Sequence, residues 1–249
     1  MDITTGIPGA QTLRRGLSIL RLLAENQEQG LRIADVIAMT GFERATVHRL
    51  LTSLVEEHFA ERDLDGKLYR LGMEAMRLGM ASMKRAPLIG SYRPVMQRIA
   101  RLSGDTVFLL VRQGDWTMCM HREEGPYPVR VFSTEVGSVR PLGVGAAGIA
   151  LLAAQSDDAI SGYLKRNTAV LHKYGHAAAQ LRQTVAQVRK LGYSETINEL
   201  TEGICGVGAS IPIAQGTFAA VSIGTIASRM GVERRAKLGE ILRDALLAA

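Results

Sequence analysis

The chain has 249 residues, of which 47% are hydrophobic, and its formal net charge is +6 at pH 7. This composition can fill a sizeable core and excludes a disordered chain, while the length suits two domains better than one. The two cysteines exclude a disulfide framework, and the modest basic excess allows a polyanionic partner without requiring one.

The sequence carries no sign of export or of a membrane span. Its N-terminal segment lacks an apolar signal core, and the longest run of apolar and glycine residues, 144–154, has about half the length of a span. We therefore expect a cytoplasmic protein with no membrane partner.

Two short helices are predicted at the start of the chain, over residues 12–25 and 33–39, with the polar run NQEQG between them. The apolar face of the first helix is expected to carry Leu13, Leu17, Leu20 and Leu23.

A third helix follows Gly41 in the segment GFERATVHRLLTSLVEEHF. Its buried face is expected to carry Val47, Leu50, Leu51, Leu54 and Val55. Val47 and Leu50 stand six and nine residues beyond Gly41, a spacing that fits the second helix of a helix-turn-helix. On periodicity alone, a solvated helix of a small bundle explains this segment equally well.

The residues after this helix favour DNA recognition. Asp65-Gly66 is a strong hairpin signal, so a two-stranded wing is predicted directly after the helix. The outward face of the helix and the wing combine cations that seek phosphates with side chains able to approach base edges. The candidate DNA-binding residues are Arg44, Thr46, His48, Arg49, Thr52, Arg62 and Lys67.

The remaining sequence mixes helices with antiparallel-looking strands, which predicts an α+β second domain. We expect a first domain over 1–72, a linker helix within 73–86 and a second domain over 87–249. Strands are predicted at 106–112, 116–122, 129–137, 204–213 and 217–226, and helices at 94–102, 148–154, 177–191 and 232–247.

A glycine-rich segment, GVGAAG at 143–148, matches the dinucleotide-binding pattern G-x-G-x-x-G. Its context argues against a nucleotide, because Arg140 and Pro141 interrupt any buried strand before it and no acidic residue follows at the required distance. A small-residue loop that opens a helix still offers free backbone N–H groups to a carboxylate.

Other reactive side chains fit no recognisable site. Cys205, and His121 near Cys119, lack the base and orienting group that a nucleophile needs. His172 and His176 have helical metal-ligand spacing but no further ligand nearby, so we interpret them as surface residues. No metal and no cofactor are expected.

The segment TGFERATVHRLLTSL, followed by Tyr69-Arg70-Leu71-Gly72, resembles the winged helix-turn-helix of the IclR family of bacterial transcription regulators, and the resemblance extends over nearly the whole chain. It implies a C-terminal, GAF-like α/β domain that binds small organic acids. The matching pocket positions are Ala146, Ala147, Thr196, Cys205 or Gly206, Ser222 and Gly224.

Several positions depart from the usual pattern of this family. Ile149 replaces a common Lys, Thr196 a frequent Asp and Gly224 a frequent Ser, which leaves fewer side-chain donors for a ligand. Ile37 stands where a small Ala is usual.

The resulting hypothesis is a ligand-responsive transcriptional regulator, acting as a repressor or an activator. Its expected partners are a double-stranded DNA operator, a small organic acid and other copies of itself, as a homodimer or homotetramer. Leu13, Leu17 and the helix over 73–84 are candidates for the contact between copies. The alternatives are an NAD-dependent or hydrolytic enzyme built on the second domain, and a ligand sensor that regulates protein partners.

Overall fold

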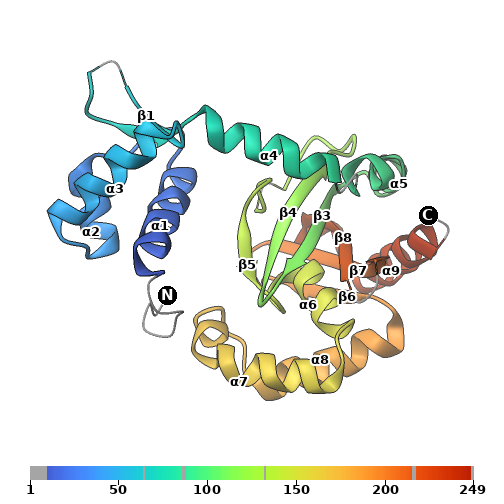
Figure 1. Ribbon diagram of the computed structural model, residues 1–249. Helices are drawn as coiled ribbons and strands as arrows, with labels where there is room; N and C mark the ends of the chain where they lie inside the picture. The colour runs from blue at the N-terminus through green and yellow to red at the C-terminus, as the bar shows by residue number, and fades with distance from the viewer. Residues whose placement is uncertain (1–9, 64, 86–87, 132, 215–216, 248–249) are drawn as a thin grey trace. The chain divides into compact units, whose positions relative to one another are not determined.

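The computed structural model describes residues 10–63, 65–85, 88–131, 133–214 and 217–247. The chain divides into two compact units, Met1–Pro87 and Leu88–Ala249 (Figure 1). Within the described ranges, no helix is both long enough and apolar enough to cross a membrane.

The first unit packs three helices against a short antiparallel hairpin. Its elements are α1 (Gln11–Glu25), α2 (Ile33–Thr40), α3 (Arg44–Glu56), β1 (Ala60–Arg62), β2 (Tyr69–Leu71) and α4 (Met73–Arg85). The buried side chains that form its core are Ile19, Leu23, Leu31, Val36, Val47, Leu51, Ala60 and Tyr69.

The apolar face predicted for α1 is buried only in part. Leu23 is buried, but Leu13 and Leu17 are 65% and 41% exposed, and Ile19 takes the core position instead. The helix carries so many apolar residues that more than one face satisfies the helical period, and packing against α3 selects the face with Ile19.

Gly41 makes the tight turn between α2 and α3. It ends α2 with φ +68°, a left-handed conformation that glycine adopts without the steric cost of a Cβ, and its N–H donates to the carbonyl of Ile37 at 2.9 Å. At the other end of α2, Asp35 accepts from the backbone N–H of Arg32 at 2.8 Å. Both ends of this short helix are therefore fixed by local hydrogen bonds.

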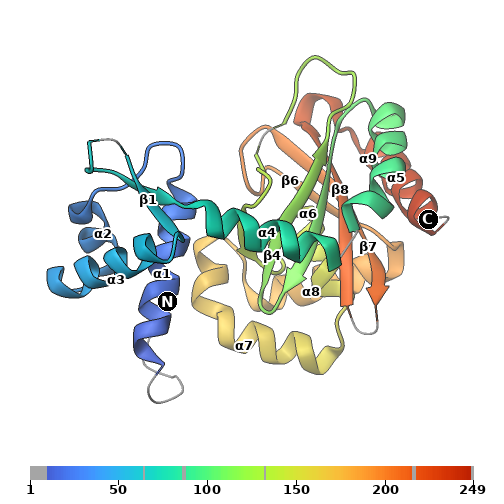
Figure 2. The same cartoon turned by 45° about the horizontal axis from the view of Figure 1, so that its top comes forward.

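The second unit is a six-stranded antiparallel sheet with the order β5-β4-β3-β8-β7-β6, covered by helices on both faces (Figures 1 and 2). Helices α5 and α9 lie side by side on one face, while α6 covers the other face with α8 and α7 outside it. The strands are β3 (Thr106–Gln113), β4 (Trp116–Glu123), β5 (Val139–Pro141), β6 (Ser194–Ile197), β7 (Ile204–Ala214) and β8 (Thr217–Ile226). The helices are α5 (Leu88–Ser103), α6 (Gly145–Ala153), α7 (Asp157–Lys173), α8 (Ala178–Leu191) and α9 (Val232–Leu247), with a short 3₁₀ helix, η1, at Ala227–Arg229.

Alternating side chains of the central strands pack into two separate hydrophobic clusters, one on each face of the sheet. On β3, Val107 and Leu109 pack toward α5 and α9, whereas Phe108 and Leu110 pack toward α6. Both faces of the strand are buried, so its sequence is a continuous apolar run.

Some predicted elements of the second unit differ from those observed. Residues 129–137 form no strand in the described part: the backbone N–H of Val131 donates to the side chain of Thr106 at 3.4 Å, and the edge strand is the later β5. Helix α5 begins at Leu88, before Pro94, and both α7 and β6 are absent from the prediction.

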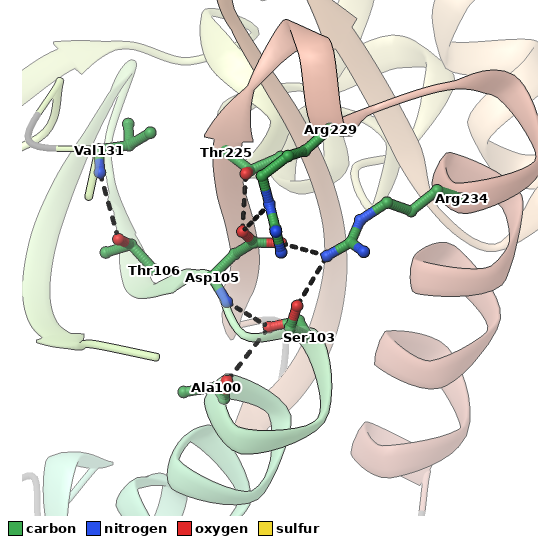
Figure 3. Close-up of polar contacts among 8 residues, drawn as sticks. All are labelled: Ala100, Ser103, Asp105, Thr106, Val131, Thr225, Arg229 and Arg234. Carbon is green, nitrogen blue, oxygen red and sulfur yellow. Dashed lines mark hydrogen bonds and ion pairs between the residues drawn. The ribbon is translucent and has the colours of Figure 1, made fainter. Parts of the chain in front are cut away.

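A buried carboxylate ties the ends of the sheet to α9 (Figure 3). The side chain of Asp105, 1% exposed, accepts from Thr225 at 2.7 Å, from Arg234 at 2.7 Å and from Arg229 at 3.3 Å. Arg234 also donates to the carbonyl of Ser103 at 2.7 Å. These bonds compensate the burial of the charge, so the cluster has a structural role.

Candidate functional site

The outward face of α3 presents side chains that have no polar partner among the described residues. Arg44, His48 and Arg49 are exposed, and within the described residues their side chains have no hydrogen-bond or ion-pair partner. Thr46 and Thr52 lie half-buried beside them, while Val47 and Leu51 are fully buried on the opposite face. One face of the helix therefore packs in the core of the unit, while the opposite face is available to bind another molecule.

The hairpin that follows has one ordered turn and two exposed cations, Arg62 and Lys67. Asp63 accepts from the backbone N–H groups of Leu68 at 3.1 Å and Lys67 at 2.7 Å, and these bonds hold the pKa of its carboxyl below the ordinary value. The side chain of Lys67 is exposed, and the guanidinium of Arg62 lies over the ring of Tyr69 at 4.9 Å.

Arg70, on strand β2 of the hairpin, is directed back toward the rest of the first unit. Its guanidinium donates to the carbonyls of Glu28 at 3.4 Å and Gln29 at 3.2 Å, so it fastens the hairpin to the loop after α1. This contact joins residues more than forty positions apart and has no local sequence signal.

The second unit contains a cavity between α6 and the sheet, with a volume of about 60 Å³. That is several times the ~10–15 Å³ that one water molecule requires on this measure, so the space suits a small ligand. Every position that the family resemblance implies for a ligand pocket borders it: Ala146, Ala147, Thr196, Cys205, Gly206, Ser222 and Gly224.

The glycines of the second unit bring α6 against the sheet. A Cβ on Gly208 of β7 would lie 2.7 Å from the backbone carbon of Ala146, so only glycine permits this approach. Ser194 donates to the carbonyl of Ala146 at 2.6 Å and fixes the helix over β6. Every strand pair in the described part of the unit is antiparallel, so the G-x-G-x-x-G segment does not follow the parallel strand of a dinucleotide site.

The alternation of β7 directs residues 205 and 206 to opposite faces of the sheet. Gly206 faces α6, because a Cβ there would meet Thr196 and Ala146. The side chain of Cys205 packs in the cluster beneath α5 and α9, and so borders the cavity without pointing into it.

Neither cysteine is placed as a nucleophile. Both are buried, and burial raises the pKa of the Cys119 thiol to about 11. A protonated, inaccessible thiol is unreactive at neutral pH. The imidazole of His121 pairs with Glu123 at 2.8 Å, and the Cys119 thiol contacts the backbone carbonyl of His121, at 3.6 Å.

The N-terminus of α6 already holds a carboxylate of the chain itself. Oε1 of Glu199 accepts from the backbone N–H of Gly145 at 2.6 Å and lies 3.1 Å from Nε2 of His176. His176 is therefore wrongly assigned to the surface, since its side chain is only 10% exposed, whereas His172 is exposed. No cluster of metal ligands exists among the described residues.

Arg140 is a cavity residue that the sequence reading missed. It lies on β5, is partly buried, and donates through Nη1 to Thr134 at 2.6 Å and through Nη2 to the carbonyl of Ser133. In the sequence, Arg140 is a lone cation in the otherwise apolar stretch VRPLGVG, which could have indicated a buried polar site. From the sequence alone it is interpreted only as evidence against a buried strand.

Comparisons with known proteins match both units. Residues 80–248 match the C-terminal domain of bacterial IclR-type transcriptional regulators, and residues 12–64 match the IclR helix-turn-helix domain. The chain belongs to the IclR family. The predicted α+β fold with an N-terminal helix-turn-helix is confirmed.

Individual relatives cover almost the whole chain. The transcriptional regulator KipR of Bacillus subtilis is 27% identical over 95% of this chain and 94% of its own. The transcriptional repressor IclR of Escherichia coli is 26% identical over 93% and 86%. An IclR homologue from Microbacterium hydrocarbonoxydans, solved in complex with 4-hydroxybenzoate, has a TM-score of 0.73 and 20% identity over 95% and 96%. The relatives are named as regulators, so the family is not one of enzymes.

Proposed function

We propose that this IclR-family regulator binds a specific DNA operator through α3 and the hairpin, and that a small organic acid in the cavity controls this binding. The exposed, unpartnered cations on α3 carry the DNA part of the proposal, because Arg44 and Arg49 have no other use within the described residues. The assigned DNA contacts are Arg44, Thr46, His48, Arg49, Thr52, Arg62 and Lys67. Because bacterial DNA lies in the cytoplasm, the proposal includes a cytoplasmic location.

Selection from a random duplex library tests the DNA part. The full-length protein is expected to enrich one sequence, with an apparent affinity that falls steeply as salt rises, because phosphate contacts release counterions. A sensor that acts only on protein partners enriches no duplex and shows no such slope. Failure to enrich any sequence would overturn operator recognition.

The cavity residues carry the effector part. The complex of a relative with 4-hydroxybenzoate supports an organic acid as the ligand class. Ala147 is 4% exposed and borders the cavity, so Ala147→Trp is expected to fill it and abolish any thermal stabilisation by the acid. Ala179→Trp, on the exposed face of α8, adds the same side chain away from the cavity and should leave the stabilisation intact.

Dimerisation, or a tetramer built from dimers, completes the proposal. A single winged helix offers few DNA contacts, and two copies on two half-sites add their binding energies. The exposed side chains of Leu13, Leu17, Met73, Met76 and Met80 offer an apolar surface for this contact. Sedimentation of the wild type and of Leu13→Glu/Leu17→Glu checks it; an unchanged oligomer in the double variant would remove α1 from the interface.

A further inference from the structure

Two side chains of opposite charge border the cavity with hydrogen-bonding capacity left over. Arg140 lies on β5 and Glu199 follows β6, which are the two edge strands of the six-stranded sheet. No ion pair joins them in the described structure, and neither belongs to the pocket positions taken from the family resemblance. The cavity therefore receives a cation from one edge of the sheet and an anion from the other.

Arg140 is a partly buried cation without a counterion. A guanidinium has five N–H donors, and this one uses two of them, toward Thr134 and the carbonyl of Ser133. No carboxylate among the described residues pairs with it. Burial lowers the pKa of the guanidinium, yet an arginine remains protonated at neutral pH. A carboxylate that enters the cavity would supply the missing counterion.

Glu199 leaves one oxygen unused. Oε1 receives both the N–H of Gly145 and Nε2 of His176, whereas Oε2 has no hydrogen-bond partner in the described part of the chain. The first N–H of α6 is thus occupied by the protein, which directs an incoming acid away from that end of the helix. Oε2 accepts hydrogen bonds only, so it selects a hydroxyl or an amine.

We propose that the ligand of this cavity is a compact organic acid that also carries a hydroxyl or amino group, with its carboxylate on Arg140 and its donor on Glu199. The inference rests on the proposed role of the cavity as the effector site. A plain acid leaves Oε2 unpaired and adds a second negative charge to the cavity, and a neutral alcohol leaves Arg140 uncompensated. Only a ligand that carries both functions and is long enough to reach both groups satisfies them together, and the apolar side chains of Phe108 and Leu110 also border the cavity.

Matched compounds test this assignment by calorimetry and thermal unfolding of the full-length protein. One set is propanoate, 3-hydroxypropanoate, 3-aminopropanoate and 3-hydroxypropanamide; the other is benzoate, 4-hydroxybenzoate, 4-aminobenzoate and 4-hydroxybenzamide. In at least one set, the hydroxy or amino acid is expected to bind about tenfold more tightly than both the plain acid and the amide.

Two substitutions separate the two contacts. Arg140→Gln is expected to weaken binding of the preferred acid by about 10- to 100-fold, because it removes a charge-assisted, forked contact. Glu199→Gln keeps an acceptor for the N–H of Gly145 but replaces the free acceptor with a donor, so the preference for the hydroxy or amino acid over the plain acid should disappear. Arg182→Gln, on the exposed face of α8, removes the same charge outside the cavity and should change nothing.

Arg140→Lys keeps the charge without the fork and should bind the acid with intermediate affinity, which preserves the test if the Gln variant fails to fold. Unchanged acid binding in the Arg140 variants, or equal affinity for plain and hydroxylated acids, overturns this inference. Either result leaves the proposal that an acid is the effector intact. No binding by any compound of either set overturns this inference together with the acid-effector proposal. Selection from the random duplex library tests DNA binding independently of both results.

Discussion

Replacing Arg49 by alanine separates DNA recognition from folding. The side chain is exposed on α3 and has no partner in the described structure, whereas Val47 and Leu51 hold the helix from its buried face. Arg49→Ala should therefore change the free energy of unfolding by less than about 0.5 kcal/mol, the range of surface substitutions that remove no contact. Any large effect on DNA binding then belongs to the interface.

The size of that effect depends on what Arg49 contacts. A base-edge contact contributes about 1–3 kcal/mol per half-site, which corresponds to roughly 5- to 150-fold in the dissociation constant. A phosphate contact weakens all duplexes alike and lowers the slope of log K against log salt by about one for each copy of the protein. The two roles therefore leave different signatures in one data set.

Fluorescence anisotropy with the selected duplex, over a series of salt concentrations, measures both quantities. Arg182→Ala serves as the matched control, because it removes the same charge from α8 in the second unit. Circular dichroism and urea unfolding confirm that each variant is folded. If Arg49→Ala retains both the affinity and the salt slope of the wild type, the assignment of α3 as the reading helix is refuted at this position.

Three further substitutions or reactions probe the framework. Asp105→Ala removes the carboxylate that Thr225, Arg229 and Arg234 contact; because the two arginine side chains are 23% and 35% exposed, it should lower the free energy of unfolding by about 1–3 kcal/mol in urea titrations, and a loss below about 0.5 kcal/mol would show that the cluster does not stabilise the fold. Cys119 has a thiol pKa raised to about 11 by burial and is protonated at pH 8, so it and the buried Cys205 should react with a thiol reagent only after unfolding, and rapid labelling of the native protein would contradict their placement. Gly41→Ala meets no neighbour within 4 Å but forces a Cβ into a left-handed turn, so it should cost about 1–2 kcal/mol in thermal unfolding, and a neutral result would mean that the turn relaxes.

The helix-turn-helix could be predicted from the sequence because its determinants are local. Gly41 fixes the turn, the helical period identifies Val47 and Leu51, and Asp65-Gly66 marks the hairpin. Each of these signals acts over fewer than ten residues. The face of α1 was harder, since its apolar residues allow more than one face and packing against the other elements decides which is buried.

The cavity was only half predictable, for a related reason. Family positions on α6 and on the strands pointed to its walls, and all seven border it. Glu199 and Gly145 lie 54 positions apart, so no local pattern announces the bond between them. The segment 129–137 shows the opposite error, because its β-type residues satisfy strand periodicity while its carbonyls and hydroxyls, at Ser133 and Thr134, bond to Arg140.

The departures from the family pattern and the charged cavity residues belong to one arrangement. Ile149, at a position where the family often has lysine, is buried among apolar side chains of the α6 cluster and offers nothing to a ligand. Gly224 lets the ring of Phe108 approach to 3.1 Å of where its Cβ would stand, so aromatic surface lies where a serine hydroxyl is frequent. With fewer donors on α6 and β8, selection of the ligand falls to Arg140 and Glu199 at the two edges of the sheet. Gly224→Ser returns a hydroxyl donor to β8 and should therefore reduce the loss of acid affinity that Arg140→Gln causes, whereas an unchanged loss in the serine background would show that the missing donor is not the cause.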